Sequence, residues 1–171
     1  MSRMKTVEHD RFGRLEAGAA GDADTLWQGT APLGAEEVDV LLWASGAGAP
    51  DSGELDDLAA RLAALPALDA AARAALRAYL GGDRHFIDFH VEELADSAAV
   101  GRLVREAAGA DVPVDAFVAA LRLHGVGLWP GGPSRPPAVV LDYVFEPGLS
   151  DQVLAVRATR HGAVVSVDWE S

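Results

Sequence analysis

The period of the apolar positions changes twice along the chain. Between residues 11 and 44 apolar and polar residues alternate, which is the period of β-strands. From 54 to 121 apolar residues recur every three or four positions, which is typical of amphipathic helices. From 122 to 171 the alternation returns. This order favours an α+β fold, with a mainly antiparallel sheet formed by N-terminal and C-terminal strands and a central block of about five helices packed on it.

The N-terminal part predicts short strands at 12–16, 25–30 and 38–43. In the last of these both faces are largely apolar, so we expect an inner strand that is covered on both sides. The stretch 31–34 contains Pro32 and is expected to end the strand before it. We treat the chain, 1–171, as a single domain in which residues 1–10 are a candidate disordered tail.

Capping and helix-breaking residues divide the central segment. Pro66 is expected to end the first helix, and Asp69, Asp83 and Ser97 are expected to cap the next three. Pro113 suits the first turn of a short fifth helix. The side chains predicted to face the core include Leu55, Leu58, Leu62 and Leu65 in the first helix and Val100, Leu103, Val104 and Ala107 in the fourth.

Strands return in the C-terminal part. The strand at 123–129 contains Gly125 and Gly127, which indicate a bulge or a close approach of backbone. A strand at 139–146 follows a loop, and the last two strands, 153–160 and 163–169, are expected to form a hairpin.

Composition narrows the class of protein. The chain has 171 residues, no cysteine and a net charge of −12. The charge opposes non-specific nucleic-acid binding, and the lack of cysteine fits a reducing compartment. No stretch approaches the roughly 20 apolar residues that a membrane helix needs. We therefore expect a soluble cytoplasmic protein that binds neither nucleic acid nor membrane.

Several stretches carry a family resemblance. Residues 86–94, residues 117–130 followed by 139–143, and the closing 169–171 have the order and spacing of a known bacterial family. The opening at 12–15 agrees with it. In these stretches the chain resembles the family called domain of unknown function 2004. The resemblance implies a bacterial source and the α+β arrangement. It implies no established activity, so it assigns no functional residue.

The third predicted helix offers a candidate for chemistry. His85, Asp88 and Glu92 share one helix face because they are three or four residues apart. Such a set could bind zinc or a similar metal, with Glu92 as a general base, and His124 could join it from a strand. These four residues are the candidate catalytic residues, and the first three are the candidate metal ligands.

A plainer explanation of this helix is favoured. His85, Asp88 and Glu92, like the neighbouring pair His90 and Glu93, are then charged or polar side chains on the solvated face of an amphipathic helix. His124 is more often a satisfied, partly buried histidine of a strand. The sequence also lacks Gly-x-Ser-x-Gly and Gly-x-Gly-x-x-Gly motifs, so we expect neither an elbow serine nor a cofactor.

Four tryptophans are predicted on strands or at strand ends. Trp129 is the one expected to be exposed, because Pro130 and the Gly/Pro-rich loop 130–137 follow it. Trp129 and Pro130 are therefore the predicted binding surface.

The function predicted from these features is a non-catalytic module that recognises another protein with its sheet face or this loop. A sharper form is an immunity-like role in which the chain blocks a basic toxin. The alternatives are a metal-assisted hydrolase that uses His85, Asp88, Glu92 and His124, and a homodimer built through an edge strand or the sheet face.

Overall fold

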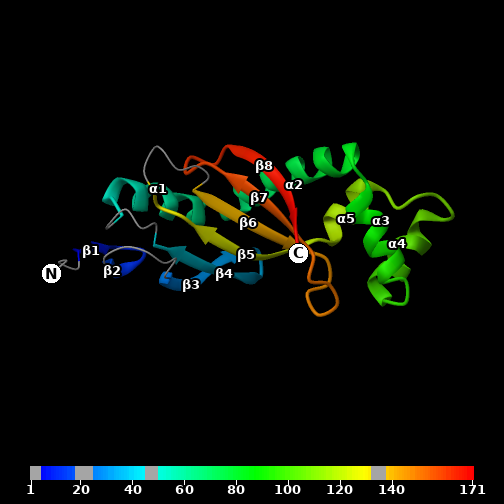
Figure 1. Cartoon of the computed structure of the whole chain (residues 1–171), viewed down its shortest axis with the longest axis horizontal. Helices are drawn as coiled ribbons and strands as arrows, with labels where there is room; N and C mark the ends of the chain where they lie inside the picture. Colours follow the sequence, from blue (N-terminus) through cyan, green and yellow to red (C-terminus); the bar gives the residue numbers. More distant parts are fainter. Residues whose placement is uncertain (1–4, 18–24, 45–49, 132–137) are drawn as a thin grey trace.

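Two sheets and five helices form the regular structure of the described residues, 5–17, 25–44, 50–131 and 138–171, in the computed structural model (Figure 1). The small sheet contains β1 (Lys5–His9) and β2 (Gly13–Ala17). The large sheet contains β3 (Thr25–Leu33), β4 (Glu36–Trp43), β5 (Arg122–Leu128), β6 (Val139–Val144), β7 (Val153–Ala158) and β8 (Val164–Glu170). The helices are α1 (Ser52–Ala63), α2 (Leu65–Gly82), α3 (His85–Glu93), α4 (Ala98–Ala107) and α5 (Val114–Ala120).

The strands of the large sheet follow one another in chain order, from β3 at one edge to β8 at the other. Every neighbouring pair is antiparallel except β4 and β5, which are parallel. All five helices lie between these two strands in the sequence, as a parallel pair requires a long crossover connection. The predicted α+β class is confirmed. Within the described ranges, β4 and β5 form the only parallel pair in an otherwise antiparallel sheet.

The helices are not all packed on the sheet. In Figure 1, α1 and α2 lie behind the large sheet, whereas α3, α4 and α5 lie beyond its end. At 18 residues, α2 is about 27 Å long, and six strands are about 24 Å wide. It contacts β3, β7 and β8, and so spans most of the sheet, leaving the short helices to pack around its end. No helix of the described ranges is long and apolar enough to cross a membrane.

Strand β4 lies inside the sheet, between β3 and β5, as its apolar pattern predicts. Val38, Val40 and Leu42 are buried on the face that the helices cover. Leu41 and Trp43, on the opposite face, are half-buried. The expectation of a strand covered by other elements on both sides is therefore wrong for the described residues, because the helices lie on one face only.

The N-terminal elements differ from the predictions in two places. Residues 5–9 form β1 instead of a disordered tail, and the His9 Nε2 atom lies 2.8 Å from Asp56 Oδ1 on α1. Residues 1–4 lie outside the described residues. Strand β3 continues through Pro32 to Leu33, because β3 is an edge strand and the missing N–H of a proline costs no ladder bond there.

The predicted caps give mixed results. Ser97 caps α4, since its Oγ accepts a hydrogen bond from the N–H of Val100 at 3.2 Å. Val104, which was expected in the core, is 46% exposed on that helix. Pro66 lies in the first turn of α2, which begins at Leu65, so the predicted break before it is confirmed. Asp69 is not a cap, because the helix has begun four residues earlier.

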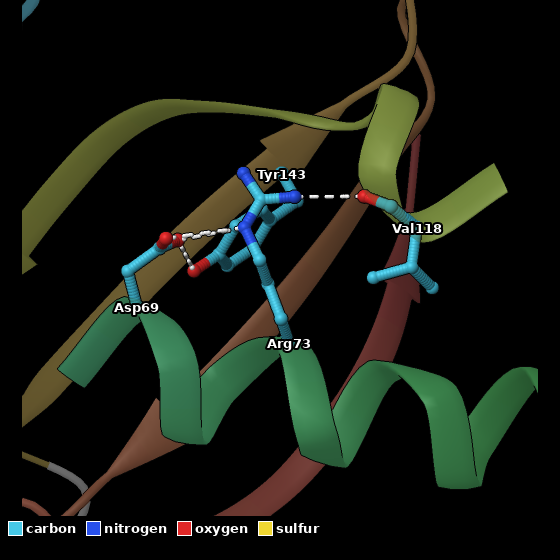
Figure 2. A network of polar contacts seen from close by, with 4 residues as sticks. All are labelled: Asp69, Arg73, Val118 and Tyr143. Carbon is cyan, nitrogen blue, oxygen red and sulfur yellow. Dashed lines mark hydrogen bonds and ion pairs between the residues drawn. The ribbon is translucent and has the colours of Figure 1, made fainter. Parts of the chain in front are cut away.

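Asp69 instead joins α2 to the sheet and to α5, as Figure 2 shows. Its Oδ1 accepts a 2.6 Å hydrogen bond from the Tyr143 hydroxyl on β6. The Arg73 Nε donates to both carboxylate oxygens at 3.1 Å, and Nη1 donates to the Val118 carbonyl at 2.7 Å. The guanidinium also lies over the Tyr143 ring, 5.3 Å from its centroid. Burial raises the pKa of Tyr143, and the adjoining carboxylate adds to the rise, so the hydroxyl stays a donor.

We predict that Tyr143→Phe lowers the free energy of unfolding by about 1.5–3 kcal/mol, the usual worth of a hydrogen bond to a charged group. The substitution keeps the ring but leaves Asp69 with Arg73 alone. Urea denaturation followed by circular dichroism measures this loss.

Tyr79→Phe is the matched control, because Tyr79 is half-buried on α2 and makes no hydrogen bond through its hydroxyl within the described residues. Its removal should change the free energy of unfolding by at most about 0.5 kcal/mol. Equal losses in the two variants would show that the Tyr143–Asp69 bond does not hold α2 to the sheet.

Candidate functional site

The predicted metal site on α3 is not assembled. His85 is exposed, and its Nδ1 atom lies 2.7 Å from Asp83 Oδ1, which precedes the helix. Asp88 and Glu92 are exposed, on a helix whose buried side chains lie elsewhere. The described part of the chain contains no group of three or more His, Asp and Glu residues that could hold a metal ion. The geometry therefore gives the metal-assisted hydrolase no support.

His124 lies at a β-bulge, where the register of β5 against β6 shifts between Leu123 and Gly125. The bulge predicted for this strand is confirmed. The imidazole is exposed and lines an open cavity beside the 147–151 turn, and the described lining of that cavity includes no residue of α3. The structure thus does not bring His124 together with the candidate ligands on α3.

His90 is fully buried, contrary to its expected place on the solvated face of the third helix. Its Nδ1 donates a 2.8 Å hydrogen bond to the Phe86 carbonyl, which leaves Nε2 as the acceptor of the Ser150 hydroxyl at 2.8 Å. Burial lowers the pKa of His90, so the ring is neutral at pH 7. Its ring is 4.4–6.0 Å, between centroids, from the rings of Phe86, Phe89, Phe117 and Phe145.

Trp129 and Pro130, the predicted binding surface, are less exposed than expected. Trp129 is half-buried because it stacks on Trp43, with ring centroids 5.2 Å apart and planes 12° apart. Pro130 is buried, so it cannot offer much surface to a partner. Residues 132–137 of the predicted binding loop lie outside the described residues. Gly127 makes room for the stacked pair, since an added Cβ would come within 3.3 Å of the Trp129 Nε1.

The face of the large sheet that faces away from α1 and α2 is the larger candidate site, and we call it the open face (Figure 1). No helix of the described ranges lies in front of it. Because side chains alternate between the faces of a strand, the register assigns its residues. Its central residues are Asp39, Leu41 and Trp43 on β4, Gly125 and Gly127 on β5, Val140 and Asp142 on β6, Ala155 and Arg157 on β7, and Ser166, Asp168 and Glu170 on β8.

Three carboxylates form one row across the open face. Asp39 is paired with Gly125, Gly125 with Asp142, Asp142 with Ala155, and Ala155 with Asp168. The residues between the acids are glycine and alanine, which have no side chain long enough to cover a carboxylate. The row is therefore an acidic strip with a shallow floor.

The acids of this strip have different partners. Arg157 on β7 donates to Asp168 at 3.1 Å and to Glu170 at 2.7 Å. The Asp142 carboxylate is half-buried and makes no hydrogen bond or ion pair with any described residue. Burial raises the pKa of Asp142, and Glu170 raises it further, while His124 and Arg157 oppose the rise. A partly desolvated carboxylate that forms no ion pair with any described residue thus lies at the centre of the open face.

Sequence reasoning missed this strip for a simple reason. Asp39, Asp142 and Asp168 each look like one polar position of an alternating strand. Only the register of the strands, which depends on pairing across the parallel β4–β5 junction, places them in one row. The one available signal was the pair of glycines on β5, which indicated a bulge or a close approach of backbone.

Comparisons with known proteins leave the open face to be interpreted from its own geometry. The resemblance to domain of unknown function 2004 stays a prediction. No family model, no curated protein and no solved structure matches the chain.

Proposed function

We propose that this chain is a protein-binding module whose open face receives a basic segment of a different protein. The observation that carries the proposal is Asp142. A half-buried carboxylate with a raised pKa, and with no ion pair to any residue that the structure describes, costs stability in the free protein. An arginine or lysine from a partner, placed on the strip between Asp39 and Asp168, would supply the missing cation.

The stacked tryptophans supply the apolar part of the same surface. Trp43 and Trp129 lie two residues beyond Leu41 and Gly127 on their strands, and so at the same side of the sheet as the acidic strip. Tryptophan next to charged groups is the composition of interface hot spots.

The negative charge of the open face favours a different, basic protein over a second copy of this chain as its partner. If two open faces came together, Asp39, Asp142, Asp168 and Glu170 of one copy would face the same acids of the other copy. Among the open-face residues named above, Arg157 is the one cation that could offset this repulsion. Like charges across an interface are unfavourable. A basic partner fits the strip and the net charge of −12, and a basic toxin blocked by an immunity-like protein is one partner of this chemistry. A bacterial cytoplasm, which fits the lack of cysteine, is the proposed location.

The proposal predicts that a nona-arginine peptide binds the chain at 0.15 M salt. The triple variant Asp39→Asn, Asp142→Asn, Asp168→Asn should weaken this binding by about 10-fold or more, since exposed ion pairs are worth up to about 1 kcal/mol each and Asp142 is half-buried. Isothermal titration calorimetry measures the affinity. Trp129→Ala should weaken binding in addition, because it removes one ring of the stacked pair.

The matched control is Glu93→Gln, Asp96→Asn, Glu106→Gln, which removes the same charge from exposed positions of α3, α4 and the turn between them. It should keep wild-type affinity to within a few-fold. Equal weakening in both triple variants would mean that net charge alone attracts the peptide, and the open face would then have no part in recognition.

A second prediction concerns Asp142 in the free protein. At pH 7 its ionised carboxylate is penalised in the folded state, because burial raises its pKa above the unfolded value. Asp142→Asn should therefore raise the melting temperature at pH 7. The gain should shrink as the pH falls through the raised pKa, since the native carboxyl then takes up a proton and loses its penalty.

Thermal melts at pH 7 and at pH 4 measure this difference, with Glu93→Gln as the exposed single control. A destabilised Asp142→Asn protein at pH 7 would show that Asp142 has a stabilising partner, and it would remove the observation on which the binding proposal rests.

A further inference from the structure

We propose that Ser150 is a nucleophile for acyl transfer from small carboxylic esters, with His90 as its general base. This inference goes beyond the binding function and rests on a different part of the molecule, the turn between β6 and β7. Ser150 and His90 are sixty residues apart in the sequence, so no local sequence motif predicts that they form a pair.

The first observation is the hydrogen-bonded pair itself. Ser150 Oγ and His90 Nε2 are 2.8 Å apart, which is the reach required of a nucleophile and its base. The Phe86 carbonyl accepts from Nδ1 at 2.8 Å and so fixes the tautomer, leaving the lone pair of Nε2 directed at the serine. A third group that orients the base completes the pattern of nucleophile, base and orienting acceptor.

The second observation is the strained turn that carries Ser150. Glu146, a residue with a side chain, has a positive φ of 48°. Its carbonyl accepts hydrogen bonds from Leu149 N–H at 2.8 Å and Ser150 N–H at 3.1 Å, which lock the turn. Gln152 N–H donates to Ser150 Oγ at 3.2 Å, a contact that stabilises negative charge on that oxygen. Strain of this kind is kept where the surrounding structure fixes a functional geometry.

The third observation is space for a substrate. Ser150 is half-buried and borders a cavity of about 600 Å³, which is large enough for a small ester. Leu149, at 57% exposure, gives it an apolar rim. Its other lining residues include His124, Val144, Gly148 and Val153.

The chemistry balances with water as the only co-reactant. Ser150 Oγ bonds to the ester carbonyl carbon while its proton moves to His90 Nε2, and the carbon–alkoxide bond breaks as that proton passes to the leaving alcohol. Water then bonds to the acyl carbon, gives a proton to Nε2, and releases the carboxylic acid as that proton returns to Oγ.

The orienting group sets the expected rate. A neutral carbonyl stabilises an imidazolium less than a carboxylate does, and the buried aromatic surroundings of His90 also disfavour its charge. Acyl transfer should therefore be slow on unactivated esters. A probe with a good leaving group reports the nucleophile without requiring fast turnover.

The experiment treats the intact chain with diisopropyl fluorophosphate at pH 7.5 and follows adducts by mass spectrometry with peptide mapping. We expect one adduct per chain, on Ser150, and none on Ser150→Ala. The matched control is Ser52→Ala, which removes an exposed serine at the start of α1 and should be labelled like the wild type.

His90→Gln tests the base. General-base catalysis contributes about 10²–10⁴-fold, so the labelling rate should fall by at least about 100-fold in a variant that keeps the wild-type near-ultraviolet circular dichroism. Should this variant unfold, the site of the adduct and the Ser150→Ala and Ser52→Ala pair decide the question. An unlabelled Ser150, or equal labelling rates in folded His90→Gln and wild type, would show that the pair only fastens the 146–150 turn to α3.

Discussion

The hydrogen bond from Tyr143 to Asp69 is the constraint on which the arrangement of this molecule depends. The partly buried Asp69 carboxylate accepts hydrogen bonds from a hydroxyl on β6 and from a guanidinium on its own helix. The same guanidinium reaches the end of α5. The Asp69 carboxylate thus links α2 to the sheet, and its partner Arg73 links α2 to α5. With α1 and α2 on one face (Figure 1), the opposite face of the sheet in the described structure carries the acids and the stacked tryptophans.

Asp69 and Asp142 show how the two faces of one sheet differ. Asp142 immediately precedes Tyr143 on β6, so the two side chains point to opposite faces. On the helix side Asp69 and Tyr143 are hydrogen-bonded to each other, and Arg73 bonds to both Asp69 and Val118, so these polar groups hold elements together. On the open side Asp142 lies among other acids and forms no ion pair within the described ranges, and its burial costs stability. Strain and unsatisfied charge of this kind are expected at sites of function, where stability is given up for recognition.

Local signals in the sequence predicted the elements, and contacts between distant residues decided the rest. The cap at Ser97, the bulge near Gly125 and the inner position of β4 depend on neighbouring residues, so they were predictable. Asp69 looked like a cap because helix starts favour aspartate, but Pro66 already serves the first turn of α2. His90 was placed in solvent by its polarity, whereas the Phe86 carbonyl and Ser150, sixty residues away, satisfy it in the core. Neither that pair nor the row of aspartates has a signature in a linear pattern.

The parallel pairing of β4 with β5 has a consequence for synthesis in the cell. The β3–β4 hairpin leaves the ribosome early, but its partner β5 follows only after all five helices. During that delay the apolar edge of β4 has no neighbour and could pair with another nascent chain. Glu36, Glu37 and Asp39 lie along that strand, and charged gatekeepers of this kind oppose such aggregation. The acidic residues of β4 thus oppose aggregation of the nascent chain, and Asp39 later forms part of the acidic strip of the folded protein.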